Sequence, residues 1–194
     1  MKRLAVFALL PILLVGCSSV GVLVTPENNA VQMPHYAFRI PPDQGWEMRK
    51  MGGNSESVLI NNKAGAASYQ IALMRNVVLD ANMRTQSANT VADHFRGMEE
   101  QIMIEEGVKR GRYQLKNLVK DVRRLGDRTF YTMTYEATSG AQIQFASIYL
   151  LFPKAEGNDS FIVAHYTATL PFGAALNSSY KADFDAILQE MVIH

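Results

Sequence analysis

Two segments carry apolar residues at the three- and four-residue spacing of an amphipathic helix. The first lies between Ser87 and Gly107, and its apolar positions are Val91, Phe95, Met98 and Ile102. Thr90 and Asp93 have the spacing of a capping box there, and Gly107 is placed to end the helix. The second begins near Ser178 and carries Tyr180, Phe184, Ile187, Leu188 and Met191. The spacing predicts two helices, each with one apolar face docked on a core.

Alternation of apolar and polar residues predicts strands in most of the remaining chain. Two short pairs come first, residues 36–40 with 46–48 and residues 57–61 with 68–78. Four longer runs follow the first helix, at 113–122, 129–137, 141–152 and 160–170. Turn residues such as Leu125-Gly126-Asp127 and Ser139-Gly140 separate these runs, which predicts an antiparallel meander.

The run 141–152 is apolar on both of its faces. Ile143, Phe145 and Tyr149 lie on one side, and the other side carries Ala146, Ile148, Leu150 and Phe152. Such a strand needs cover on both sides. The order of elements therefore predicts a single α+β domain, an antiparallel β-sheet covered by helices in an αβα sandwich.

The N-terminus has the pattern of a secretion signal. Lys2 and Arg3 precede an uncharged apolar stretch from Leu4 to Val15, and Pro11 interrupts it. The stretch is shorter than the roughly 20 residues of a membrane-spanning helix. We expect a targeting segment rather than a permanent transmembrane anchor.

The tetrad Leu14-Val15-Gly16-Cys17 resembles the lipobox of bacterial lipoproteins at all four positions. The resemblance implies diacylglycerol transfer to the Cys17 sulfur, cleavage after Gly16 and acylation of the new amino group. Ser18 follows Cys17, and a residue other than Asp there implies an outer-membrane location facing the periplasm. An ordinary signal peptide that happens to contain a cysteine is the alternative interpretation.

These boundaries divide the chain into three parts. Residues 1–16 form the predicted lipoprotein signal peptide, residues 17–34 a lipidated cysteine with its tether, and residues 35–194 the folded domain. The tether prediction rests on Ser, Pro and Asn residues between positions 18 and 34. Residues 20–24 are the exception, because their β-branched side chains also suit an edge strand.

The opening of the domain, Phe38-Arg39-Ile40-Pro41 followed by Gly45-Trp46, and a closing helix with Phe184 and Ile187 resemble the PsbP-like fold. That fold includes bacterial DcrB-type lipoproteins, and the similarity covers about residues 35–193. It implies a binding or assembly module rather than a catalyst, and it supplies no catalytic residues to transfer.

Composition excludes several classes of protein. The chain has 194 residues, of which 48% are hydrophobic, and 19 Lys and Arg balance 18 Asp and Glu. Near-zero net charge argues against a nucleic-acid binder. A lone cysteine permits no internal disulfide and no cysteine-based metal cluster. We find no phosphate-binding loop, nucleophile elbow or helical metal motif, and therefore predict no enzyme, no cofactor and no metal.

His165 is the histidine closest to a chemical role. It shares a strand face with Val163 and Thr167, and Tyr131, Tyr135 or Glu136 could reach it from a neighbouring strand. A hydrogen-bonded structural histidine is the favoured interpretation, with a hydrolase as the least favoured function.

The chain between residues 109 and 128 concentrates positive charge, with eight basic residues against two acidic ones. The basic residues are Lys109, Arg110, Arg112, Lys116, Lys120, Arg123, Arg124 and Arg128. They form a candidate surface for an anionic partner, such as a lipid headgroup, a cell-wall polymer or an acidic protein. The competing interpretation is that they protect an exposed strand from edge-to-edge aggregation.

The leading prediction is thus a lipid-anchored module of the bacterial cell envelope that binds or scaffolds a partner without catalysis. The alternative is a periplasmic carrier of a small apolar ligand, with Tyr131, Tyr149 and Tyr166 lining its pocket.

Overall fold

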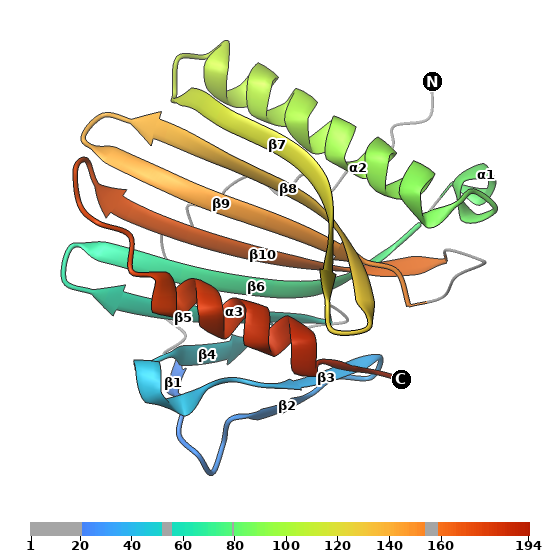
Figure 1. Cartoon of the computed structure of the whole chain (residues 1–194), viewed down its shortest axis with the longest axis horizontal. Helices are drawn as coiled ribbons and strands as arrows, with labels where there is room; N and C mark the ends of the chain where they lie inside the picture. The colour runs from blue at the N-terminus through green and yellow to red at the C-terminus, as the bar shows by residue number, and fades with distance from the viewer. Residues whose placement is uncertain (1–20, 52–55, 79, 154–158) are drawn as a thin grey trace.

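The computed structural model describes residues 21–51, 56–78, 80–153 and 159–194, and they form one domain built on a large antiparallel sheet (Figure 1). The sheet has eight strands. In spatial order they are β1 (Val22–Leu23), β4 (Glu47–Lys50), β5 (Ser57–Ala64), β6 (Ala67–Val77), β10 (Ser160–Pro171), β9 (Gln142–Leu151), β8 (Arg128–Ser139) and β7 (Gln114–Leu125). The α+β class and the predicted meander from β7 to β10 agree with this order.

Among the described residues, three α-helices accompany the sheet. They are α1 (Ala81–Arg84), α2 (Ala88–Ile102), which continues as a π-helical turn η2 (Met103–Val108), and α3 (Ser178–Glu190). The N-cap of α2 is Ser87, whose Oγ accepts a bond from the Thr90 amide at 3.2 Å. The N-cap of α3 is Asn177. Both predicted helices are confirmed, although the first is capped by Ser87 rather than by Thr90, and the second by Asn177 rather than by Ser178 or Ser179, either of which the sequence allows.

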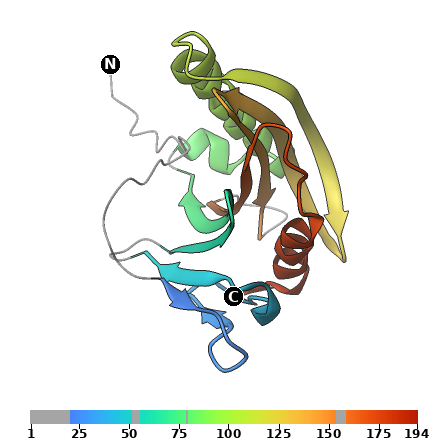
Figure 2. The same ribbon diagram turned by 90° about the vertical axis from the view of Figure 1, so that its left-hand side faces the viewer.

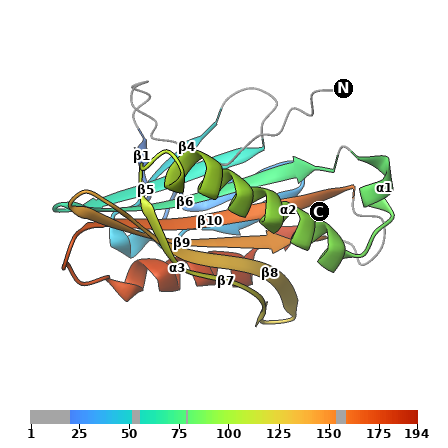
Figure 3. The same ribbon diagram turned by 90° about the horizontal axis from the view of Figure 1, so that it is seen from above.

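The central strands separate two apolar clusters. One contains Tyr149 and Leu151 of β9 together with the buried face of α3. The other contains Ile148 and Leu150 of the same strand together with Val91 and Phe95 of α2. Figures 2 and 3 show α2 and α3 on opposite sides of β8, β9 and β10. Both faces of strand β9 are thus covered. This cover explains why its residues are apolar on both faces.

A second sheet lies on the α3 side. It has three strands, in the order β11 (Val192–Ile193), β3 (Tyr36–Arg39) and β2 (Ala30–Gln32). Its residues Val31, Tyr36 and Phe38 share the apolar cluster of α3. A sheet and a helix together cover this face, so the predicted αβα sandwich is not confirmed.

The predicted pairing of residues 36–40 with 46–48 is wrong. Strand β3 pairs with β2 and β11, whereas β4 pairs with β1 and β5 in the large sheet. Between them, the 3-10 turn η1 (Pro42–Gln44) ends at Gly45, which has a φ of 68°. This left-handed glycine redirects the chain into the other layer instead of closing a hairpin.

Residues 21–34 belong to the fold rather than to a tether. They contain β1 and β2, and Val24 and Val31 are 3% and 1% exposed in the core around α3. The edge-strand interpretation of residues 20–24 is the correct one for Val22 and Leu23. The first described residue, Gly21, already lies against Glu47 of β4.

Candidate anionic-partner surface

Strand β7 forms one edge of the large sheet, and the predicted basic surface runs along it and along the loop before it (Figure 1). Seven of its eight basic side chains are exposed, and Arg128 is half-buried. The strand has a register shift between Lys116 and Val119, and Asn117 takes a φ of 52° there. Such irregularities and charges are devices that protect an edge strand from aggregation, so this position fits both sequence interpretations.

Three of the eight basic residues bind groups of the helices. Lys109 Nζ lies 2.5 Å from Glu105 Oε1, and Lys120 Nζ lies 2.5 Å from Glu100 Oε2, both on the α2–η2 helix. Arg128 donates to the carbonyl oxygens of Leu188 and Gln189 at 3.1 and 3.4 Å, at the C-terminus of α3. A cation there satisfies carbonyls that lack partners within the helix.

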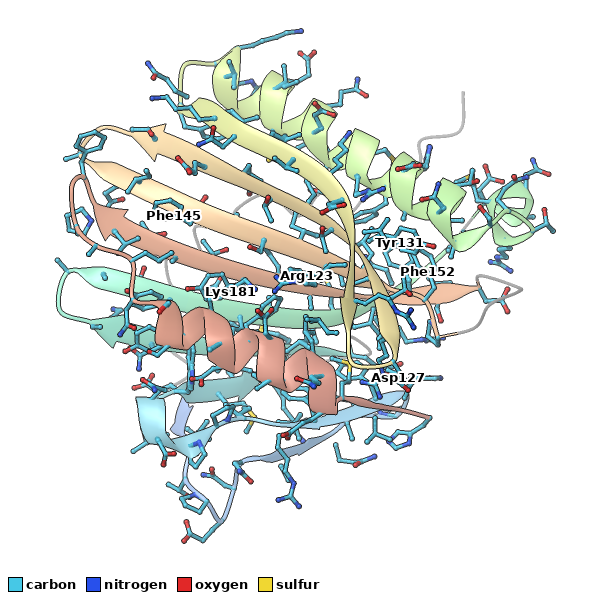
Figure 4. All side chains as sticks on the ribbon, viewed as in Figure 1. Arg123, Asp127, Tyr131, Phe145, Phe152 and Lys181 are labelled. Atoms are coloured by element: carbon cyan, nitrogen blue, oxygen red, sulfur yellow. The ribbon has the colours of Figure 1, made fainter. Side chains whose placement is uncertain are left out.

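Arg123 belongs to a cluster that joins β7 to α3 (Figure 4). Its Nη1 donates to the Tyr149 hydroxyl at 2.7 Å, and its Nη2 lies 3.7 Å from Asp185 Oδ2. Lys181 Nζ lies 2.6 Å from Asp185 Oδ1 and 5.0 Å from the ring centres of Tyr149 and Phe184.

The electrostatics of this cluster favour a charged Arg123. Burial opposes the charged form, but Tyr149 and Asp185 outweigh it and raise the pKa of Arg123. The contacts of this guanidinium are therefore internal and stabilise the docking of the edge strand.

Arg112, Lys116 and Arg124 differ from these residues. Their side chains are exposed, and within the described part of the chain they form no ion pair or side-chain hydrogen bond. Arg124 and Lys116 point to opposite faces of β7, because Thr129 and Glu136, their partners in β8, lie on opposite faces of that strand. The positive charge available to a partner thus comes mainly from these three residues.

The three tyrosines predicted to line an apolar pocket do not converge. Tyr149 and Tyr166 are each 2% exposed and lie in the α3 cluster. Tyr131 pairs with Leu150 and packs with the α2 cluster on the other face. The carrier prediction loses its proposed site, because the sheet lies between these side chains.

Two cavities lie at the end of the molecule where β10 begins, and the sequence did not indicate either. One has a volume of about 320 Å³ and lies beside Tyr131 and Phe152, whose ring centres are 5.7 Å apart. The other, about 230 Å³, is lined by residues that include His35, Arg75 and His194. His35 Nδ1 lies 2.7 Å from Glu56 Oε1, which also accepts a bond from Arg75 at 3.4 Å. Residues far apart in sequence meet here, so no local motif could reveal the cluster.

His165 is half-buried between Ala72 and Ile148 of the adjacent strands. Its Nε2 lies 3.3 Å from Thr167 Oγ1. Burial lowers the pKa of His165 to about 4, so the ring is neutral near pH 7. Glu136 lies on the opposite face of the sheet, since it pairs with Phe145. The geometry fits the structural interpretation of this histidine.

The lipobox residues Leu14, Val15, Gly16 and Cys17 lie outside the described residues. Among the helices of the described ranges, none combines the length and apolar character needed to cross a membrane. In the same ranges, no three His, Cys, Asp or Glu side chains gather as a metal site would require.

No family model and no curated protein sequence matches the chain. Several solved structures are similar to it in fold. CyanoP, the cyanobacterial PsbP of Synechocystis sp. PCC 6803, is 14% identical, with a TM-score of 0.44 over 93% of this chain and 99% of that chain. LpqN of Mycobacterium tuberculosis, which is involved in cell envelope biogenesis, is 11% identical, with a TM-score of 0.46 over 84% of this chain and 88% of that chain.

A third similar structure belongs to a protein of Bacteroides thetaiotaomicron VPI-5482. It is 10% identical, with a TM-score of 0.41 over 82% of this chain. The match covers 45% of that protein, so this chain spans less than half of its length.

Proposed function

We propose that this protein is a lipid-anchored module of the bacterial envelope, attached through Cys17 and facing the periplasm from the outer membrane. It binds an anionic envelope partner without catalysis, and Arg112, Lys116 and Arg124 supply the contact. This proposal rests on one observation: some basic residues between positions 109 and 128 bind groups within the domain, and others do not. Lys109, Lys120, Arg123 and Arg128 have internal partners, and Arg110 also makes an interaction within the domain, whereas these three exposed cations form no ion pair or side-chain hydrogen bond among the described residues.

The physical argument concerns desolvation and competition. A cation already paired with a carboxylate must give up that pair to bind another anion, whereas an unpaired exposed cation loses only water. Arginine also presents a planar set of donors that matches carboxylate and phosphate oxygens. An anionic partner therefore gains most from the unpaired cations, and its binding should weaken with added salt.

The test is chemical crosslinking and co-purification from membranes with Lys116→Glu and Arg124→Glu chains. We expect each reversal to reduce recovery of the partner. Arg39→Glu is the matched control, because Arg39 is an exposed arginine of β3 whose side chain forms no ion pair or hydrogen bond with the described residues. Equal recovery from all three variants and the parent chain would contradict the proposed surface.

Anchoring is tested separately. The parent chain should incorporate radiolabelled palmitate and fractionate with outer membranes, and Cys17→Ser should do neither. Palmitate incorporation by the Cys17→Ser chain would show that another residue carries the acyl group.

A further inference from the structure

The two cavities at the end of the molecule where β10 begins adjoin each other. Pro153 and Ile193 line both of them and thus form a shared wall. The larger, about 320 Å³, also has Tyr131 and Phe152 in its wall, and we call it the aromatic cavity. The smaller, about 230 Å³, we call the polar cavity, because most of its lining side chains are polar; they are His35, Arg75, Asp159, Ser160 and His194. An apolar and a polar compartment therefore lie side by side.

Arg75 is the cation of the polar cavity, and its contacts within the domain are long. Its Nε donates to Ser160 Oγ at 3.3 Å, and its Nη1 lies 3.4 Å from Glu56 Oε1. Glu56 Oε1 has a closer partner, since His35 Nδ1 lies 2.7 Å from it. Hydrogen bonds between charged groups are ordinarily about 2.7–2.9 Å long, so this guanidinium is weakly bound and can still donate to a ligand.

Asp159 is the anion of the polar cavity. It directly precedes Ser160, the partner of Arg75, and the Val78 amide donates to its backbone carbonyl at 2.8 Å. The residue is exposed, and its carboxylate forms no ion pair or hydrogen bond with the residues that the structure describes. The polar cavity thus holds an available carboxylate close to a weakly bound guanidinium.

The wall of the aromatic cavity is built from packed rings. Tyr131 and Phe152 lie edge to face, with ring centres 5.7 Å apart and planes at 82°, and Figure 4 labels both at this end of the sheet. Phe152 also stacks on Phe161, with 5.2 Å between ring centres. Asp127 and Arg128 line the same cavity and carry opposite charges, which balance. Because Tyr131 and Phe152 are half-buried, part of each ring stays open to a large apolar group.

The charges of the polar cavity restrict the chemistry of a ligand. A ligand with a single charge displaces water from both Arg75 and Asp159 but pairs with only one of them, which leaves the other desolvated. A zwitterion pairs with both. An α-amino acid carries its carboxylate and its ammonium group on one carbon, so it needs a cation and an anion close together. The bond from Arg75 to Ser160, the neighbour of Asp159, gives that arrangement.

We propose that the two cavities together form a binding site for a free α-amino acid with a large apolar side chain. Arg75 and Ser160 donate to its carboxylate, and Asp159 accepts from its ammonium group. Its side chain lies against Tyr131 and Phe152. This site goes beyond the proposed function, because it needs neither the acyl anchor nor the basic residues of β7.

Isothermal titration calorimetry of the full chain with L-phenylalanine tests the site. Three control ligands each lack one part: hydrocinnamate lacks the ammonium group, phenethylamine lacks the carboxylate, and glycine lacks the side chain. We expect L-phenylalanine to bind with saturation and each control ligand to bind at least about tenfold more weakly, because each leaves part of the site without a partner. Equal binding of phenethylamine would refute the role of Arg75, and no binding of L-phenylalanine up to about 10 mM would refute the site.

Variants of the two charged residues test where the ligand binds. Arg75→Gln and Asp159→Asn should each weaken binding of L-phenylalanine by about tenfold or more. Arg39→Gln is the matched control and should bind as the parent chain does, because Arg39 is an exposed arginine of β3 whose side chain forms no ion pair or hydrogen bond in the described ranges. Circular dichroism checks that each variant is folded. Asp159→Asn changes an exposed side chain without such contacts, so it tests the site even where Arg75→Gln fails to fold, and an unchanged affinity of Asp159→Asn would overturn the proposal.

Discussion

Gly107 illustrates how close packing restricts a single position. A Cβ there would lie 1.9 Å from Tyr113 Cζ, and the Tyr113 hydroxyl donates to the Met103 carbonyl at 3.0 Å within the same helical turn. The ring thus occupies the space of the missing side chain and bonds the backbone of η2. The sequence indicated a helix end at this glycine, but its function is to let Tyr113 approach.

We therefore expect Gly107→Ala to lower the free energy of unfolding by about 1–3 kcal/mol, because the ring must move and its hydrogen bond is strained. Gly97→Ala is the control, since nothing lies within 4 Å of a Cβ in that position of α2. It should stabilise the protein by about 0.5–1 kcal/mol through helix propensity. Urea denaturation measures both, and equal effects would contradict the packing argument.

The lowered pKa of His165 predicts that the free energy of unfolding depends on pH. Its pKa falls from the ordinary 6.5 to about 4 on folding, so the folded chain binds this proton more weakly than the unfolded chain. Stability is then lost as the pH falls from above 6.5 towards 4. Allowing for the partial exposure of the ring, we expect the free energy of unfolding to be about 1–2 kcal/mol lower at pH 5 than at pH 7. His165→Gln should remove this difference, and an unchanged pH profile would contradict it.

At the scale of elements, β7 is an edge strand held from both sides. Lys120 joins it to α2, and Arg96 of α2 donates to the Asp121 and Thr132 carbonyls at 2.8 and 3.0 Å. Arg123 joins it to Tyr149 and to Asp185 of α3. Adjacent arginines on this strand thus have different functions, because successive side chains point to opposite faces.

The pair Arg123→Glu and Arg124→Glu tests this difference. The first brings a carboxylate towards Asp185 and leaves the Tyr149 hydroxyl without its donor, so we expect a loss of about 1–2 kcal/mol in the free energy of unfolding. The second changes an exposed residue without an ion pair and should stay within about 0.5 kcal/mol. Thermal or urea denaturation of the two chains gives the comparison. A larger loss for Arg124→Glu would refute the assignment of their contacts.

At the scale of the whole molecule, the small sheet joins the two ends of the described chain. Strand β3 pairs with β2 on one side and with β11 on the other, and the His194 amide donates to the His35 carbonyl at 3.1 Å. Trp46 is fully buried, and its Nε1 donates to Asp183 Oδ2 of α3 at 2.7 Å. Residues before position 35, which include β2, therefore belong to the layer that covers the large sheet on the side of α3.

Removal of residues 1–34 should therefore abolish cooperative unfolding, because β2 and the core side chains Val24 and Val31 leave with it. A chain that begins at Gly21 should unfold in one cooperative transition, since it keeps every described element. Circular dichroism during thermal denaturation distinguishes them. A chain beginning at residue 35 with the same transition would restore residues 17–34 as a dispensable tether.

The elements themselves were predictable because they depend on neighbours in sequence. The helical spacing of Phe184, Ile187 and Leu188 and the two apolar faces of residues 141–152 are local patterns, and both were confirmed. The meander was predictable for the same reason, since turn residues such as Gly126 and Gly140 take positive φ between consecutive strands.

Only the tertiary structure decided which strands pair and which basic residues find a carboxylate, because both depend on residues far apart in the sequence. Alternation shows that residues 36–40 form a strand but not which strand pairs with it, and β2 and β11 come from opposite ends of the chain. Composition shows eight cations between residues 109 and 128 but not which of them lie near a carboxylate, because Glu100 and Asp185 belong to different helices. Sequence fixes periodicity and charge, whereas long-range packing decides which faces, and therefore which cations, remain open to a partner.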